Sequence, residues 1–92
     1  AIQTDPGARI VTRNGEEVPL TPKELDLLRF LASREGKAVS RFEILDAVWG
    51  EEEVVSRVID TTVLGLRKKV EPDPASPRHV LSVRGVGYRF EE

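Results

Sequence analysis

The chain has 92 residues, no cysteine and one histidine, and 39% of its residues are hydrophobic and 33% charged. A chain of this length forms one small domain with a single core, and the lack of cysteine excludes disulfides and thiolate metal sites. No apolar run approaches the roughly 18 residues that a membrane-spanning helix needs, so we expect a single cytoplasmic domain over residues 1–92 with no membrane partner.

Charge is unevenly distributed along the chain. The net charge of -2 by itself argues against nucleic acid, because proteins that bind phosphate backbones usually present basic surfaces. Residues 1–55, however, hold seven Lys and Arg against eleven Asp and Glu, whereas residues 56–90 hold seven against three. This asymmetry indicates a polar molecule with one basic face.

The first twenty residues alternate short strand-like runs with turn signals. Asn14-Gly15 between two such runs is the strongest short signal for a β-hairpin. We therefore predict strands near residues 2–4, 8–13 and 16–20 that form a small antiparallel sheet.

The segment LTPKELDLLRFLASREG has the signals of a helix over residues 22–35. Thr21 and Glu24 are spaced as a capping box, with a proline at the first helical position. Gly36 is placed to end the helix in a left-handed conformation. The core stripe predicted for this helix consists of Leu25, Leu28 and either Leu31 or Ala32.

Two further helices are predicted in the middle of the chain. Ser40 and Glu43 repeat the capping-box spacing and predict a helix over residues 41–49. Ser56 is predicted to cap a third helix, which extends over about residues 56–71 and ends before a proline.

The third predicted helix has two distinct faces. At about 100° per residue, one narrow stripe is apolar and is expected to be buried; it consists of Ile59, Val63, Leu66 and Val70. The stripe that points the opposite way consists of Arg57, Thr61, Leu64 and Lys68. A bare leucine flanked by cations is unusual for an ordinary solvated face.

The C-terminal part of the chain is rich in β-forming residues around a basic, glycine-rich segment. Residues 80–83 and 88–90 flank Arg84-Gly85-Val86-Gly87, which predicts a hairpin with a basic tip. The Gly-x-Gly here is not a nucleotide-binding fingerprint, because Phe90 occupies the place of the third glycine.

Together these elements predict an α+β fold, a winged helix-turn-helix. A small N-terminal antiparallel sheet precedes three helices, the second and third helices form the helix-turn-helix unit, and the C-terminal β-hairpin is the wing. No catalytic set or ligand cluster is visible in the sequence, so we predict no enzyme, no cofactor and no metal site.

Four segments, LTPKELDLL, SRFEILDAVWG, SRVIDTTVLGLRKKVE and VRGVGYRF, resemble landmark segments of the OmpR/PhoB-type effector domain of bacterial response regulators, in the same order and at similar spacing. The resemblance covers the chain almost end to end. It implies sequence-specific binding to double-stranded promoter DNA, usually on direct repeats, for transcription regulation in a two-component system. It also implies an N-terminal receiver domain in the full-length protein, which is absent from this chain.

The resemblance places the third helix in the major groove, which is wide enough to admit an α-helix, and Arg84 of the wing in the minor groove. Trp49 and Tyr88 are equally well explained as aromatic side chains of the core and the hairpin. The residues that the resemblance and the exposed face assign to DNA are Arg41, Trp49, Arg57, Thr61, Thr62, Leu64, Gly65, Arg67, Lys68, Arg84, Gly85 and Tyr88.

Leu64 and Gly65 depart from the family pattern, which usually has long polar or basic side chains at one or both positions. A glycine inside a helix costs about 1 kcal/mol relative to alanine. One hypothesis is a close approach of the helix to the groove, with Leu64 against a thymine methyl group. The alternative is neutral drift or a contact of Gly65 within the protein.

The connection between the second and third helices contains Glu51, Glu52 and Glu53. The resemblance makes this loop a candidate contact to RNA polymerase, although three successive acids are also typical of a solvated loop. A second class of function is a winged helix that only binds protein, which the acidic half and Leu64 favour. The basic wing tip and the cationic side of the third helix favour DNA.

Overall fold

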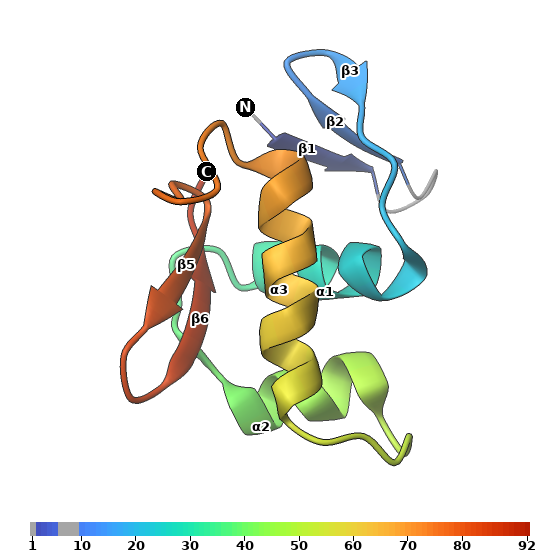
Figure 1. Cartoon of the computed structure of the whole chain (residues 1–92), viewed down its shortest axis with the longest axis vertical. Coiled ribbons are helices and arrows are strands. Elements are labelled where there is room, and N and C mark those ends of the chain that lie inside the picture. Colours follow the sequence, from blue (N-terminus) through green and yellow to red (C-terminus); the bar gives the residue numbers. More distant parts are fainter. Residues whose placement is uncertain (1, 6–9) are drawn as a thin grey trace.

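The computed structural model describes residues 2–5 and 10–92 of the chain, and α3 runs through the middle of the molecule (Figure 1). In chain order the described elements are β1 (Ile2–Asp5), β2 (Ile10–Arg13), β3 (Glu16–Glu17), α1 (Pro22–Ser33), β4 (Val39–Ser40), α2 (Arg41–Ile44), the π-helical turn η1 (Leu45–Trp49), α3 (Arg57–Val70), β5 (Val80–Val83) and β6 (Gly87–Phe90). This order confirms the predicted α+β winged-helix fold.

The N-terminal strands form an antiparallel sheet in the order β1-β2-β3. Asn14 and Gly15 both have left-handed backbone angles, with φ of 53° and 84°, which confirms the predicted hairpin turn. β3 is shorter than the predicted strand over 16–20, because Pro19 has no N–H to continue the ladder after Val18. The start of the second predicted strand, at residues 8–9, lies outside the described residues.

α1 begins with the predicted capping box, in which Thr21 and Glu24 each accept the other's backbone N–H. The helix ends at Ser33 rather than at residue 35. Gly36 has the predicted left-handed conformation, with φ of 82°, and its N–H donates to the carbonyl oxygen of Phe90 at 2.9 Å. The turn after α1 is therefore tied to the last strand.

The second helical segment covers the predicted residues 41–49, but it changes character along its length. Ser40 caps α2 with the predicted capping box. The last five residues form the wider turn η1, in which the N–H of Gly50 reaches back to the carbonyl oxygen of Leu45 at 2.9 Å. The helix-turn-helix unit thus begins with one α-helical and one π-helical turn.

Ser56 occupies the predicted N-cap position of α3, but the side-chain cap expected there does not form. Ser56 has helical backbone angles, and its side chain forms no capping hydrogen bond. The chain is already turning one residue earlier, because the N–H of Val58 donates to the carbonyl oxygen of Val55 at 3.0 Å. At the other end, Glu71 adopts an extended conformation and ends the helix where predicted.

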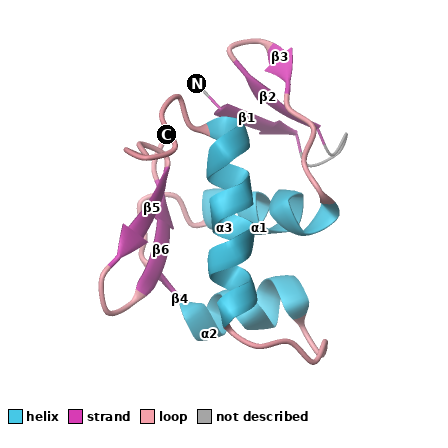
Figure 2. Cartoon of the chain, in the orientation of Figure 1, coloured by secondary structure: helices cyan, strands magenta, loops and turns pink. Residues whose placement is uncertain are grey.

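The C-terminal sheet has three strands in the order β4-β6-β5, of which β4 was not predicted. Its pairing with β6 depends on a glycine, because a Cβ on Gly87 would overlap the carbonyl oxygen of Val39. The wing is therefore a hairpin with a short third strand along the part of β6 nearest the tip, and it lies beside α3 (Figure 2).

The core lies where α1, α3 and the C-terminal sheet meet. The apolar stripe of α3 is buried as predicted, and so are the predicted leucines of α1. The core residues are Val11, Leu25, Leu27, Leu28, Leu31, Val39, Ile44, Val48, Trp49, Ile59, Val63, Leu66, Val70, Val80, Tyr88 and Phe90. Within the described ranges, none of the helices has the length and apolar character needed to cross a membrane.

Candidate nucleic-acid interface

The outward stripe of α3 is exposed as the periodicity predicts. Leu64 stands near its middle with 54% of its surface exposed, and Arg57 and Lys68 stand toward its two ends. Their side chains form no hydrogen bond or ion pair with any residue that the structure describes. The stripe therefore presents two available cations with an apolar side chain between them.

The two threonines of α3 use their hydroxyl protons within the helix. The hydroxyl of Thr62 donates to the carbonyl oxygen of Val58 at 2.8 Å, and that of Thr61 to the carbonyl oxygen of Arg57 at 3.4 Å. Phosphate oxygens accept hydrogen bonds, so neither hydroxyl can donate to a phosphate in this rotamer. The exposed face of Thr61 offers its methyl group instead.

The tip of the wing is a tight turn that displays a cation. The N–H of Val86 donates to the carbonyl oxygen of Val83 at 3.0 Å. Gly85 has φ of 78°, and a Cβ added there would meet no atom within 4 Å. Arg84 is exposed, and its guanidinium has no partner in the described part of the chain. The predicted basic tip is therefore present and available.

A network of charged and aromatic side chains joins α2, α3 and the wing. Arg41 donates through Nη1 and Nη2 to the two carboxylate oxygens of Asp60, at 2.8 and 3.0 Å, and through Nη2 to the carbonyl oxygen of Ser56 at 3.0 Å. The hydroxyl of Tyr88 donates to Oδ1 of Asp60 at 2.6 Å. Asp60 thus contacts both of the elements that flank α3.

The pKa values of the groups in this network lie well away from neutral pH. The hydrogen bonds from Arg41, and then from Tyr88, lower the pKa of Asp60 to about 2. Burial, reinforced by the bond to Asp60, raises the pKa of the Tyr88 hydroxyl, and the bond to Asp60 raises the pKa of Arg41. Asp60 is therefore ionised and Tyr88 neutral under physiological conditions.

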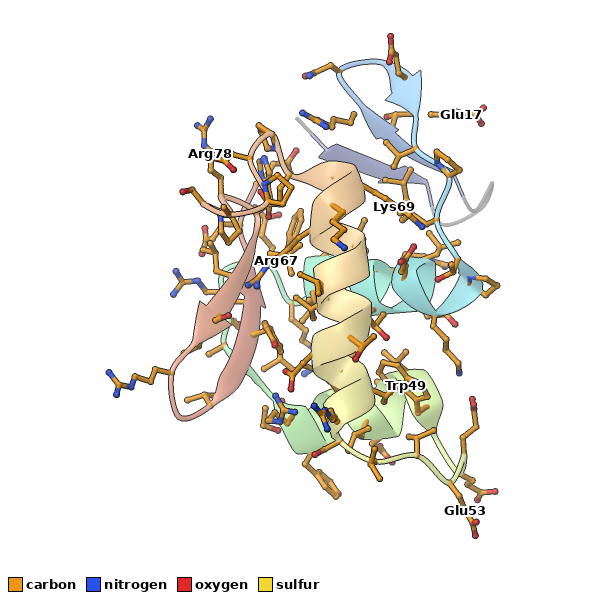
Figure 3. All side chains as sticks on the ribbon, in the orientation of Figure 1. Glu17, Trp49, Glu53, Arg67, Lys69 and Arg78 are labelled. Atoms are coloured by element: carbon orange, nitrogen blue, oxygen red, sulfur yellow. The ribbon has the colours of Figure 1, made fainter. Side chains whose placement is uncertain are left out.

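Arg67 forms a second connection between α3 and the wing, and Figure 3 shows its side chain reaching from the helix toward the hairpin. Its Nε donates to the carbonyl oxygen of Val80 at 2.9 Å, and Nη2 donates to the hydroxyl of Ser82 at 3.0 Å. The guanidinium also lies 5.7 Å from the centre of the Tyr88 ring. Unlike Lys68, Arg67 is thus engaged within the protein.

Gly65 faces α1 rather than the open stripe of α3. A Cβ on Gly65 would lie 2.5 Å from Oε2 of Glu24, which is 7% exposed and receives a hydrogen bond from Lys69 at 2.6 Å. Burial alone would raise the pKa of Glu24, but the hydrogen bonds from Lys69 and Thr21 outweigh it and lower the pKa. The structure thus gives Gly65 a contact within the protein, as the alternative interpretation expects, and the close approach to a groove stays a prediction.

The aromatic residues assigned to DNA by resemblance are largely buried. Trp49 is 4% exposed and packs in the core, with the ammonium of Lys23 at 5.7 Å from the ring centre. Tyr88 is 7% exposed. These positions agree with the alternative interpretation of both side chains as core and hairpin aromatics.

A lysine of α1 holds the acidic loop between η1 and α3. Lys23 donates to the carbonyl oxygen of Val48 at 3.0 Å and also pairs with the carboxylate of Glu52. Glu51 and Glu53 are exposed, and Figure 3 shows Glu53 at the outer end of the loop. The loop therefore presents its acids to solvent beside the helix-turn-helix unit.

Sequence reasoning missed two acids that shape this interface. Asp60 is the single acid within residues 57–70, a signal that an acid has a specific partner in an otherwise cationic helix. Glu71 is 2% exposed, and its carboxylate accepts N–H groups from residues 78–80 at 2.7 to 3.2 Å. Its only sequence signal is its place before a proline. Glu71 thereby anchors the loop that leads into the wing.

The site consists of an exposed helix with free cations, a glycine turn that carries a free arginine, and side-chain connections between the two. These are the features of a winged helix-turn-helix DNA-binding domain. Among the described residues, no group of three or more His, Cys, Asp or Glu side chains is placed to hold a metal ion. The sequence matches the family described as "Transcriptional regulatory protein, C terminal" over residues 15–90, and the chain belongs to this family.

The relatives are longer proteins. The chain is 48% identical over 88 residues to the transcriptional regulatory protein AfsQ1 of Streptomyces coelicolor, which covers 95% of the chain and 39% of AfsQ1. The chain spans about two fifths of the length of the curated relatives it matches.

Two solved structures have the same fold. The response regulator DrrB of Thermotoga maritima, an OmpR/PhoB homologue, superposes with a TM-score of 0.93 at 37% identity, over 99% of this chain and 42% of DrrB. The DNA-binding domain of RstA from Klebsiella pneumoniae, solved in complex with the RstA box, superposes with a TM-score of 0.88 at 31% identity, over 98% of this chain and 90% of that one. The resemblance to OmpR/PhoB-type effector domains is confirmed.

Proposed function

We propose that this domain binds double-stranded DNA at specific sequences, with α3 in the major groove and Arg84 of the wing in the minor groove, and thereby regulates transcription. The observation that carries the proposal is the division of the cations on this side of the molecule. Those engaged within the protein are Arg41, Arg67 and Lys69. Those without a hydrogen bond or ion pair to the described residues are Arg57, Lys68 and Arg84.

The spacing along α3 supports a major-groove position. Arg57 and Lys68 are eleven residues apart, which is about three turns and roughly 16 Å along the axis on one face of a helix. The major groove is about 12 Å wide between its phosphate walls. The two cations are therefore spaced to meet phosphates on either side of the groove, with Thr61 and Leu64 between them at the base edges.

Leu64 gives this arrangement a particular chemistry. An exposed leucine between two phosphate-binding cations can contact the methyl group of thymine but cannot form hydrogen bonds with guanine or adenine edges. We therefore propose that the central reading position of α3 favours thymine. The hydroxyls of both α3 threonines bond back to the helix, which leaves their methyl groups for the same kind of contact.

A hollow of about 390 Å³ between α2 and the wing supports a continuous DNA path from one groove to the next. It is lined by Arg41, Tyr88 and the wing residues 82–87, which include Arg84. The exposed Arg84 gives this hollow a cation that is unpaired among the described residues, whereas the charge of Arg41 is paired with Asp60. A phosphate of the strand between the two grooves fits that electrostatic character.

The further partners are proposed from the longer relatives. In the full-length protein an N-terminal receiver domain controls this domain, which acts in the cytoplasm as part of a two-component system and binds direct repeats as two copies in tandem. The acidic loop with Glu51, Glu52 and Glu53 is the proposed contact to RNA polymerase. Its exposure beside the helix-turn-helix unit supports this assignment.

The test is selection from a pool of fragmented genomic DNA, followed by affinity measurements over a salt series for the recovered sequence. We expect a recurring direct repeat and a log affinity that falls linearly with log salt, with a slope of roughly -3 per domain from three free cations. Arg84→Ala should weaken binding and reduce the slope by about 1.

Arg78→Ala is the matched control for the loss of one arginine. Arg78 is exposed, and Figure 3 shows it at the end of the hairpin opposite the tip. This variant should keep both the affinity and the salt slope of the wild type. Binding that shows no sequence preference even at low salt, with Arg84→Ala equal to Arg78→Ala, would contradict the proposal and favour a protein-binding module.

A further inference from the structure

We propose that Asp60 is a positioning residue for DNA recognition: by holding Arg41 of α2 and Tyr88 of β6 at the same time, it fixes the wing relative to α3, so that the two groove contacts act as one unit. This inference rests on the proposed function. The inference assigns a role to Asp60, an acid on the side of α3 that is proposed to meet DNA phosphates, where a negative charge is unfavourable.

The part of the wing near the tip needs such a device, because the bonds from Gly36 to Phe90 and from residues 78–80 to Glu71 hold only the opposite end of the hairpin. Beyond the β5–β6 hairpin, the sheet contains only the two-residue strand β4, which pairs Val39 with Tyr88 and Ser40 with Gly87. A two-stranded hairpin is at best marginally stable alone. The angle between the wing and α3 therefore depends on side chains that cross from one to the other.

Those side chains form two connections on one face of α3. Asp60 receives the hydroxyl of Tyr88 on β6, and Arg67, one heptad later, binds the carbonyl oxygen of Val80 and the hydroxyl of Ser82 on β5. Ser82 and Tyr88 are cross-strand partners, so the two connections meet at one rung of the hairpin. The tip with Arg84 begins two residues beyond that rung.

Asp60 also determines where α2 lies. The bidentate contact from Arg41 to Asp60, together with the bond from Arg41 to the carbonyl oxygen of Ser56, joins the start of α2 to the first turn of α3. One carboxylate thus connects three elements, of which two carry proposed DNA contacts. Holding these contacts in place before binding lowers the entropy cost of forming them.

Charge alone predicts the opposite role for this residue. The side chain of Asp60 is 49% exposed on the face proposed to meet phosphates, so removing its negative charge should strengthen binding to any DNA. Positioning predicts that removing it weakens binding to the specific site. The two effects have opposite signs, which makes the role measurable.

The experiment compares the full chain with Asp60→Asn, Tyr88→Phe and the control Asp46→Asn on the selected DNA and on an unrelated duplex. Asp46 is an exposed carboxylate on η1 with no hydrogen bond or ion pair to the described residues, so its substitution removes the same charge and leaves the network intact. We expect Asp60→Asn to lower the ratio of specific to nonspecific affinity about fivefold, a size typical of coupling within one network. Tyr88→Phe, which changes no charge, should lower it in the same direction.

A double-mutant cycle with Arg84→Ala separates positioning from general loss of structure. If Asp60 holds the wing, Arg84→Ala should cost less affinity in the Asp60→Asn background than in the wild type, because the tip is no longer held in place. A variant that is only less stable would keep the full cost of Arg84→Ala in its folded fraction.

The outcomes also distinguish this inference from the proposed function. Suppose that the wild type binds a specific site and needs Arg84 to do so. If Asp60→Asn and Tyr88→Phe then bind that site as well or better, only the positioning role is overturned. Wild type without any preferred site overturns both. If Asp60→Asn fails to fold, Tyr88→Phe and its own cycle with Arg84→Ala decide the question.

Discussion

The carboxylate of Glu24 occupies the space that a side chain at Gly65 would need, since a Cβ there would lie 2.5 Å from Oε2 of Glu24. The carboxylate cannot easily move away, because it accepts the backbone N–H of Thr21 at 3.0 Å and the ammonium of Lys69 at 2.6 Å. The glycine in the middle of α3 is therefore a packing requirement between α1 and α3.

This relationship predicts that Gly65→Ala destabilises the domain although alanine is the better helix former. The gain in helix propensity is about 1 kcal/mol, whereas crowding a side chain in a filled site costs about 1–3 kcal/mol. We expect the free energy of unfolding in urea to fall by roughly 1 kcal/mol. In a Glu24→Ala background, where the space is open, the same substitution should raise it. Stabilisation of the wild type by Gly65→Ala would contradict the packing argument.

Two glycines of the wing should respond differently to substitution. Gly87→Ala would press a methyl group onto the backbone of Val39, which no side-chain rotation can relieve, so we expect a loss of about 2 kcal/mol or more. Gly85 has φ of 78°, an added Cβ there would meet nothing within 4 Å, and asparagine tolerates that conformation. Gly85→Asn should cost less than about 1 kcal/mol. Thermal unfolding of both variants measures the two losses. Equal losses at the two positions would show that Val39 does not limit residue 87.

Stability in acid should depend on Asp60. Its pKa is lowered from 3.8 to about 2, so its contribution to folding is complete above pH 3.8 and is lost as the pH falls toward 2. Because the side chain is half exposed, that contribution is at most about 1 kcal/mol. The free energy of unfolding of Asp60→Asn should therefore approach that of the wild type as the pH falls from about 5 to about 2. A constant difference over this range would exclude the predicted linkage.

The elements that were predicted correctly are those determined by neighbours within about four residues. The capping boxes at Thr21 and Ser40, the Asn14-Gly15 turn and the buried stripe of α3 all depend on local spacing. Ser56 is the exception among the caps, because it stands at the predicted N-cap position with helical backbone angles and its side chain forms no capping hydrogen bond.

The features that were missed depend on residues far apart in the chain. Strand β4 forms only because Gly87 lets the backbone of Val39 approach β6. Asp60 meets Arg41 and Tyr88 across 19 and 28 residues, and no local pattern predicts those contacts. The candidate interface was thus predictable in its exposed stripe and its wing tip, whereas the side chains that connect them were not.

Leu64 provides the most direct test of how α3 reads DNA. It is 54% exposed and does not belong to the buried core, so Leu64→Arg should leave the free energy of unfolding within about 0.5 kcal/mol of the wild type. If Leu64 contacts a thymine methyl group, the arginine removes that preference and favours guanine, which offers two acceptors in the major groove. Sites selected by the variant should then show guanine where the wild type selects thymine. Leu64→Ala keeps an apolar surface and should retain a weaker thymine preference, so unchanged selectivity in both variants would exclude Leu64 from base reading.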